Sequence, residues 1–197
     1  MFSGIVEKMG RLEKIETKQG KVYFTIRAGG FLRGVKIGSS IACDGVCLTV
    51  IKITNGQFTV ELMPETLRLT RFSQSRAGDQ INLEKSLKVG DTIGGHFVMG
   101  HVDAVGLVKQ IVNQGPDVSL VIKAPKKIIK YLAYKGSVSL NGVSLTIGQS
   151  GRDWFKVYLI GHTLKITNLG KLLVGDKVNL EVDTIARYLE SLLRKPT

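Results

Sequence analysis

The sequence repeats itself once along almost its whole length, and this feature constrains the fold more than any other. Residues 40–49 align with residues 137–146 at a separation of 97 positions and share Ser, Gly, Val, Leu and Thr at matching places. The same separation carries residues 78–84 onto residues 175–181, with Gly, Asp, Asn, Leu and Glu in common. Since two copies of this length fill nearly all of the 197 residues, we expect two homologous domains and a short tail.

The residue pattern within each half is that of short β-strands. Residues 21–27, 58–62, 118–123 and 155–160 are rich in β-branched or aromatic residues and are bounded by Gly, Asn, Asp or Pro. Several short strands in each half are typical of a small closed barrel with little helix. We therefore predict an all-β fold with one barrel in each half, and one short helix over residues 125–132, which begin with proline.

Two tight turns stand at equivalent places in the repeats. Asp44-Gly45 and Asn141-Gly142 each separate two strand-like runs. Asp-Gly and Asn-Gly supply the positive φ angles that a type I′ hairpin turn requires. Each half is thus predicted to contain at least one tight hairpin, at the same place in the repeat.

Small hydroxyl or thiol side chains follow each of these turns. They are Cys47 and Thr49 in the first half and Ser144 and Thr146 in the second. Because residues two apart on a strand point to the same face, each pair acts together if that face lines a pocket. The alternative is that they are ordinary small or strand-forming residues. Duplication of the pattern favours the pocket.

The three histidines are His96, His101 and His162. His96 and His101 lie on a glycine-rich stretch where only Asp103 stands close enough to add a third ligand, so a zinc site has little support. An acid–base or structural role is favoured instead. His101 occupies the repeat position that Ile5 holds in the first half, so the two halves are chemically unequal.

Apolar residues recur at helical spacing in the tail, after Asp183 and Thr184, either of which can cap a helix. They are Ile185, Tyr188, Leu189, Leu192 and Leu193. This stripe predicts an amphipathic C-terminal helix that either packs on its own barrel or forms a contact between subunits.

The net charge of +12 raises the question of a nucleic-acid or membrane partner. The basic residues do not cluster beside aromatic residues, and no run of about 18 apolar residues occurs, so we predict neither partner. No phosphate-binding glycine loop and no G-x-S-x-G motif is present. The N-terminus lacks a signal-peptide core, and Cys43 and Cys47 form no C-x-x-C pair, so we expect reduced thiols and a cytoplasmic protein.

Six segments, in order and spacing, resemble the trimeric riboflavin synthases, a family of lumazine-binding repeat proteins. They are Met1-Phe2-x-Gly4-Ile5-Val6, residues 44–49, residues 94–102, Lys135-Gly136, residues 141–146 and residues 178–183. Because these segments span both repeats, the resemblance covers the whole chain and is far more specific than any single motif.

The resemblance implies two six-stranded Greek-key β-barrels in tandem, at residues 1–97 and 98–183, and an oligomerisation helix at residues 184–197. It implies a homotrimer that binds the small molecule 6,7-dimethyl-8-ribityllumazine in each barrel, with neither metal nor organic cofactor. The family's reaction, the last step of riboflavin biosynthesis, is a dismutation. One lumazine gives a four-carbon unit to another, which yields riboflavin and 5-amino-6-ribitylamino-2,4-pyrimidinedione. An association with lumazine synthase is left open.

The resemblance also assigns two sets of substrate-binding residues. The first lumazine would contact Cys47, Leu48, Thr49, Glu61, Leu62, Met63, Pro64, Glu65, Thr66, Gly100, His101 and Val102, with Lys135 from another chain. The second would contact Gly4, Ile5, Val6, Ser144, Leu145, Thr146, Tyr158, Leu159, Ile160, Gly161, His162 and Thr163. Phe2, Ser40 and Asp183 match further positions at or near the family's active site.

The chemistry of two joined lumazines needs alignment first and proton transfer second. We hypothesise that His101, Ser144 and Thr146 move protons, and that Cys47 or a hydroxyl-activated water adds to C7 of the acceptor. Which barrel holds the donor is left open. The alternative function is a non-catalytic lumazine- or flavin-binding antenna protein of the same fold. Retention of these four residues favours the enzyme, a transferase.

Overall fold

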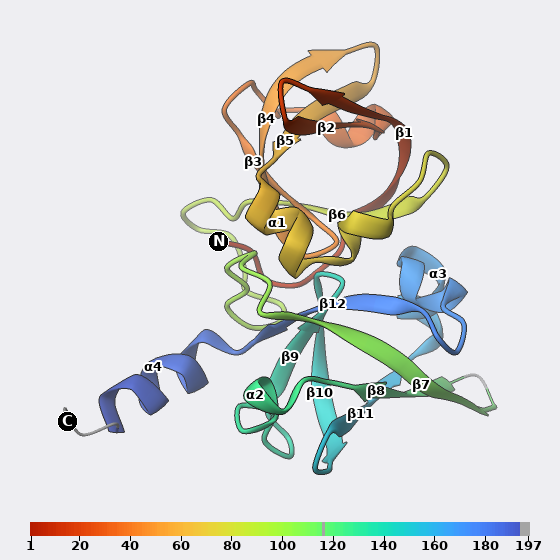
Figure 1. The fold of residues 1–197 in the computed structure, drawn as a ribbon, viewed down its shortest axis with the longest axis vertical. Helices are drawn as coiled ribbons and strands as arrows, with labels where there is room; N and C mark the ends of the chain where they lie inside the picture. The colour runs from red at the N-terminus through yellow and green to blue at the C-terminus, as the bar shows by residue number, and fades with distance from the viewer. Residues whose placement is uncertain (116, 194–197) are drawn as a thin grey trace.

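The computed structural model describes residues 1–115 and 117–193, which form two closed antiparallel β-barrels of six strands each (Figure 1). The first barrel has the strand order β1-β2-β5-β4-β3-β6. Its strands are β1 (Lys8–Lys18), β2 (Lys21–Arg27), β3 (Ser40–Cys43), β4 (Val46–Thr54), β5 (Gln57–Leu62) and β6 (Gln80–Lys85).

The second barrel, read from β7, has the order β7-β8-β11-β10-β9-β12 and so repeats the first strand for strand. Its strands are β7 (Ala104–Gln114), β8 (Asp117–Lys123), β9 (Ser137–Leu140), β10 (Val143–Ser150), β11 (Trp154–Leu159) and β12 (Lys177–Val182). The predicted all-β fold of two homologous six-stranded Greek-key barrels is confirmed.

Both predicted hairpins are present, and their backbone angles explain the residues at the turns. Asp44 and Gly45 have φ of 44° and 75°, and Asn141 and Gly142 have φ of 45° and 79°. Two successive positive φ angles are the type I′ geometry that suits the twist of the flanking strands.

Short helices occupy the connections and the C-terminus. They are η1 (Gly29–Leu32), α1 (Pro64–Leu69), η2 (Arg71–Gln74), α2 (Lys126–Ile129), α3 (Gly161–Ile166), η3 (Asn168–Lys171) and α4 (Thr184–Leu193). The helix expected over residues 125–132 is only α2, and Pro125 is its N-cap and lies outside the first turn. It ends early because Tyr131 and Leu132 donate to carbonyls three residues back, which continues the chain as tight turns.

Strand alternation decides which side chains leave the barrel core. In β10, Val143, Leu145 and Ile147 are buried, so Ser144 and Thr146 face outward. β4 has the same pattern and turns Cys47 and Thr49 to the outer surface of the first barrel. The hydroxyl and thiol residues after the two turns therefore share one outward face in each half, as their spacing predicts.

Helix α4 projects outward from the side of the second barrel (Figure 1). The residues of its apolar stripe are exposed to solvent. Its polar side contacts the second barrel, where Arg187 donates to Asp103 at 2.9 and 3.0 Å and Glu190 accepts from Lys130 and Tyr131. The stripe therefore does not pack on its own barrel. None of the helices in the described part of the chain is long and apolar enough to cross a membrane.

The two hairpin turns meet between the barrels, and four residues join them by equivalent hydrogen bonds. The backbone N–H groups of Asn82 and Asn179 donate to the side chains of Asp44 and Asn141 respectively, both at 2.8 Å. The side-chain amides of Asn82 and Asn179 then cross to the opposite turn and donate to the carbonyls of Asn141 and Asp44, both at 2.9 Å. The barrels are therefore related by an approximate two-fold axis through these turns.

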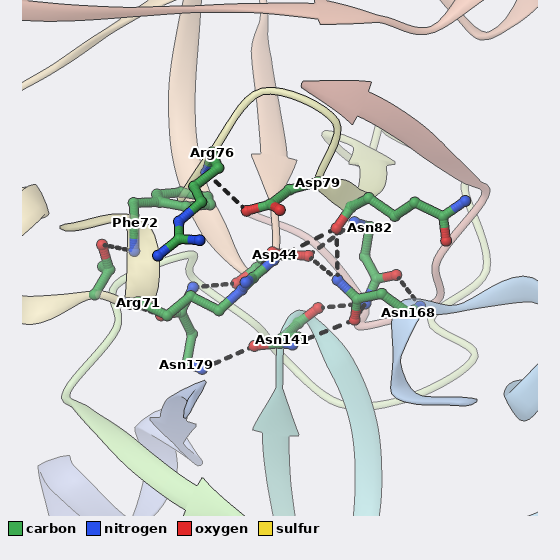
Figure 2. A network of polar contacts seen from close by, with 11 residues as sticks. Asp44, Arg71, Phe72, Arg76, Asp79, Asn82, Asn141, Asn168 and Asn179 are labelled. Carbon is green, nitrogen blue, oxygen red and sulfur yellow. Dashed lines mark hydrogen bonds and ion pairs between the residues drawn. The ribbon is translucent and has the colours of Figure 1, made fainter. Parts of the chain in front are cut away.

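The two halves of the junction differ in charge at one pair of residues, Arg71 and Asp44 (Figure 2). Arg71 forms an ion pair with the fully buried Asp44 at 2.6 Å, whereas the equivalent residues of the second half are the neutral Asn168 and Asn141. Asn168 also donates to Asp44 at 2.8 Å. The junction therefore holds a single buried carboxylate, and both halves supply its partners.

Candidate active site

A hollow of about 500 Å³ opens on the outer surface of the second barrel beside β10 and β11. It brings together the hydroxyl pair of β10 with Tyr158 and Ile160, from the end of β11, and Thr163 of α3. Its lining residues are Tyr134, Lys135, Ser144, Leu145, Thr146, Ile147, Gly148, Gln149, Tyr158, Ile160 and Thr163. Hydroxyl groups beside aromatic and aliphatic side chains suit a small ligand with a planar ring and a polar chain.

Lys135 lies at this hollow in its own chain. The resemblance assigns it to the first lumazine, held by another chain. Lys135 contacts the first lumazine only if the first-barrel site of a second copy of the chain faces this second-barrel hollow.

The N-terminal arm crosses from the first barrel to this hollow. Gly4 accepts a hydrogen bond from the backbone N–H of Ser144 at 2.8 Å, and a Cβ at Gly4 would lie 2.6 Å from the Ser144 Cβ. Glu84 holds the arm by accepting from the Ser3 N–H at 2.7 Å and the Gly4 N–H at 3.1 Å. Phe2 is fully buried and anchors the start of the arm. This crossing places Gly4 against Ser144 and Val6 in the core of the second barrel, beside the second-half residues with which residues 4–6 are predicted to bind the ligand.

The segment that joins the barrels makes the reciprocal crossing. Gly100 accepts from the Cys47 N–H at 2.9 Å, while Glu181 accepts from the N–H groups of Met99 and Gly100 at 2.7 and 2.9 Å. Burial raises the pKa of Glu181 to about 7, against the pull of these two N–H donors. Burial also raises the pKa of its repeat counterpart, Glu84. The equivalence of Glu84 and Glu181 is visible in the repeat, but their role as anchors is not.

His96 lies beside the second-barrel hollow and was not among the predicted site residues. Its Nδ1 is within hydrogen-bond distance of the Ser144 Oγ, at 2.7 Å, and burial lowers its pKa, which favours the neutral ring. Asp183, a predicted site residue that also caps α4, opposes this shift through its charge. A Cβ at Gly95 would lie 2.2 Å from the Ser3 carbonyl, so glycine there allows the close approach. His96 has no counterpart in the first half, so the repeat gives no signal for it.

The predicted first-half residues differ in how far their side chains are exposed. Cys47 is partly buried against Phe2 and Val98, whereas Thr49 and His101 are exposed. Ser40 pairs with Thr49 across β3 and β4. Glu61 forms an ion pair with Lys21 at 2.8 Å. Met63, Pro64 and Glu65 are exposed, and Thr66 and Val102 are half-buried.

Four of the predicted leucines point away from both sites. Leu48, Leu62, Leu145 and Leu159 are buried in the barrel cores, so only their backbone atoms face the outer surface. Among the residues predicted to contact the second lumazine, Ile5 is 47% exposed. Gly161 and the exposed His162 begin α3, and Val6 is buried with the second-barrel core.

The fold and these paired sites define a tandem-barrel protein of the lumazine-binding class. Residues 3–86 and again 99–183 match the family described as the lumazine binding domain, and the chain belongs to that family. The curated relatives within it are riboflavin synthases, which confirms the resemblance in the sequence. That of Brucella abortus (strain 2308) is 40% identical over an alignment of 197 positions that covers 98% of each chain. That of Photobacterium phosphoreum is 41% identical over 194 residues, 98% of this chain and 89% of the relative.

Solved structures of LumP have the same fold. LumP complexed with riboflavin superposes with a TM-score of 0.87 and LumP complexed with 6,7-dimethyl-8-(1'-D-ribityl) lumazine with 0.84. Each is 27% identical, and each match covers 92% of this chain and 99% of LumP.

Proposed function

We propose that this chain is a riboflavin synthase, a transferase that converts two molecules of 6,7-dimethyl-8-ribityllumazine into riboflavin and 5-amino-6-ribitylamino-2,4-pyrimidinedione. The observation that carries the proposal is the duplicated site within a chain about 40% identical to riboflavin synthases over nearly its full length. Four carbon atoms leave one lumazine and join the other, so the two substrates supply all the atoms and electrons of the products.

Alignment of the two rings is the largest contribution that the protein makes. Holding two reactants in contact lowers the barrier by roughly 7–11 kcal/mol, while a positioned acid or base adds about 10²–10⁴-fold. The two arms support this role, because each docks against the hairpin strand of the opposite barrel and so fixes the orientation in which one chain presents its two outer faces to its neighbours.

Proton transfer is assigned to His101, Ser144 and Thr146, which lie on the outer faces. His96 acts through Ser144: its neutral ring orients the hydroxyl that takes up or returns a proton of the 7-methyl group of a bound lumazine. Cys47, or a water activated by a hydroxyl, adds to C7 of the acceptor. Since Cys47 and Ser144 occupy equivalent positions with different chemistry, one barrel serves the donor and the other the acceptor.

A homotrimer completes the site in this proposal, with the first barrel of one copy facing the second barrel of a neighbour. The exposed apolar stripe of α4 supports it, as do the exposed side chains of Ile5, Met63 and Ile160 around the sites. The free thiols of Cys43 and Cys47 support a reducing, cytoplasmic location.

The test is to incubate the purified chain with the lumazine alone and to follow riboflavin by absorbance and chromatography. Riboflavin and the pyrimidinedione in equal amounts support the synthase. Stable binding of unreacted lumazine would indicate an antenna protein. We expect His101→Gln to lower kcat about 100-fold, and His96→Gln to lower it less, since the glutamine amide still forms a hydrogen bond with Ser144.

A further inference from the structure

The two barrels differ at one structural detail beside their sites, the bulged residue of the central hairpin strand. The pairing of β10 with β11 skips Gly148, and the pairing of β4 with β5 skips Ile51. These residues are 97 positions apart and therefore equivalent. One half thus has a glycine where the other has a β-branched side chain.

The glycine is explained by a neighbouring ring. A Cβ at Gly148 would lie 2.1 Å from the Cε2 and 2.9 Å from the Cδ2 of Tyr158, so the tyrosine ring fills the space of a side chain at 148. Gly148 does not have the positive φ that would demand glycine for backbone reasons. The contact with Tyr158 is what the glycine allows.

The first barrel has no such ring at the equivalent place. Glu61 stands where the second half has Tyr158, and its carboxylate is paired with Lys21 at 2.8 Å. Ile51 stands in the position of Gly148. The cross-strand neighbour of Glu61 is Tyr23, which lines a hollow of the first barrel together with Ile51. At the strand position itself the first barrel therefore has a carboxylate where the second has a phenol, and the phenol of the first barrel lies on the neighbouring strand.

Tyr158 is placed to contact a bound ring. It lines the hollow of about 500 Å³ together with Thr146, Ile160 and Thr163, and 48% of its surface is exposed. We propose that Gly148 is a positioning residue: by leaving room for the Tyr158 ring, it makes that ring an aromatic contact for the planar ring of the ligand at the second-barrel site. This inference rests on the proposed function, because it takes the ligand to be a lumazine or flavin.

Riboflavin titration by calorimetry tests the inference, since the product binds without reacting. We expect Tyr158→Leu to weaken one class of sites about 10-fold, the size of a lost aromatic contact, and to leave the other class unchanged. Tyr158→Phe keeps the ring and should bind like the original chain. Glu61→Gln, at the equivalent position in the first barrel, should not change riboflavin binding at the class of sites that Tyr158→Leu weakens.

Gly148→Ala tests the positioning role separately. The new methyl group displaces the ring and should weaken the same class of sites, whereas Gly148→Ala in a Tyr158→Leu background should have no further effect. Ile51→Ala is the matched variant in the first barrel and should not change this class. Circular dichroism checks that each variant is folded.

The inference is overturned if Tyr158→Leu binds riboflavin as tightly as the original chain in both classes, or if the Gly148→Ala effect persists without the ring. Failure of the original chain to bind riboflavin or to convert lumazine would instead reject the proposed function. The two failures are therefore distinguishable.

Discussion

At the scale of single residues, Gly4 and Gly20 separate the cost of a backbone conformation from the cost of a contact. Both have φ of 76°, but a Cβ at Gly20 would meet no atom within 4 Å, whereas one at Gly4 would press on Ser144. Gly20→Ala should cost only the left-handed conformation, about 1–2 kcal/mol of unfolding free energy. Gly4→Ala adds overpacking and should cost about 2–5 kcal/mol.

Activity provides the second readout of this comparison. Gly4→Ala lifts the arm from the second-barrel hollow and should abolish most riboflavin formation, while Gly20→Ala should retain it. Urea denaturation and the lumazine assay measure the two effects. Equal losses of stability in the two variants would show that the arm does not bear on Ser144.

The raised pKa of one residue, Glu181, predicts that the free energy of unfolding depends on pH. Its pKa is raised to about 7 in the folded protein from 4.5. The folded state therefore binds more protons between these values. The stabilisation that results, on the order of 3 kcal/mol, is complete below the unfolded pKa and is lost as the pH rises through the folded pKa.

Glu181→Gln removes this titration. The difference in unfolding free energy between the original chain and the variant should change in favour of the variant between about pH 5 and about pH 8. Ser191→Ala, which changes no titratable group, is the control and should give a constant difference. A constant difference for Glu181→Gln as well would contradict the raised pKa.

At the scale of elements, the sequence predicts what local pattern determines. Strands β2, β5 and β11 are recognisable because side chains alternate between core and surface, β8 because it is a short run of β-branched and aliphatic residues, and both hairpins because their turn residues adopt positive φ. β1 and β7 were not assigned, since their exposed ends dilute the alternation, and β6 and β12 were not assigned, since most of their residues are buried without alternating.

In the candidate site too, the sequence predicts the features that a local pattern determines and not those that depend on distant contacts. Ser144 and Thr146 were predicted to share a face from their spacing alone. The arms were not, because their contacts join residues far apart, such as Ser3 with Glu84 and Gly4 with Ser144. His96 was missed for the same reason: only the folded chain brings it to Ser144. The domain boundaries at residues 97 and 183 stay predictions.

Helix α4 carries the prediction for quaternary structure. Leu189 is 54% exposed and Leu192 is 83% exposed on its apolar stripe, so burial between copies would stabilise an oligomer. Leu189→Asp should shift the sedimentation coefficient from that of a trimer toward that of a monomer and should lower riboflavin formation. Ser191→Asp places the same charge elsewhere on α4 and should leave the trimer intact. A trimer that survives Leu189→Asp would exclude the stripe as the contact.

At the scale of the whole molecule, the junction shows how a duplicated chain avoids placing like charges together. The two turns touch along the approximate two-fold axis, where a Cβ at Gly45 would lie 2.7 Å from the Gly142 nitrogen. A second aspartate in place of Asn141 would put two buried carboxylates in one network. The second half instead has asparagine at both Asn141 and Asn168, so the single carboxylate keeps Arg71 as its partner.

This arrangement predicts that Arg71 and Asp44 can be neutralised without a large loss of stability only when both are replaced together. Arg71→Asn leaves the buried Asp44 without its cation and should cost about 3–5 kcal/mol of unfolding free energy. Asp44→Asn together with Arg71→Asn copies the neutral residues of the second half, keeps the amide hydrogen bonds across the axis, and should recover most of that loss. Urea denaturation of the single and double variants measures the recovery. If the double variant is no more stable than Arg71→Asn alone, the two halves are not interchangeable at the junction, and the symmetry of its hydrogen bonds does not extend to its energetics.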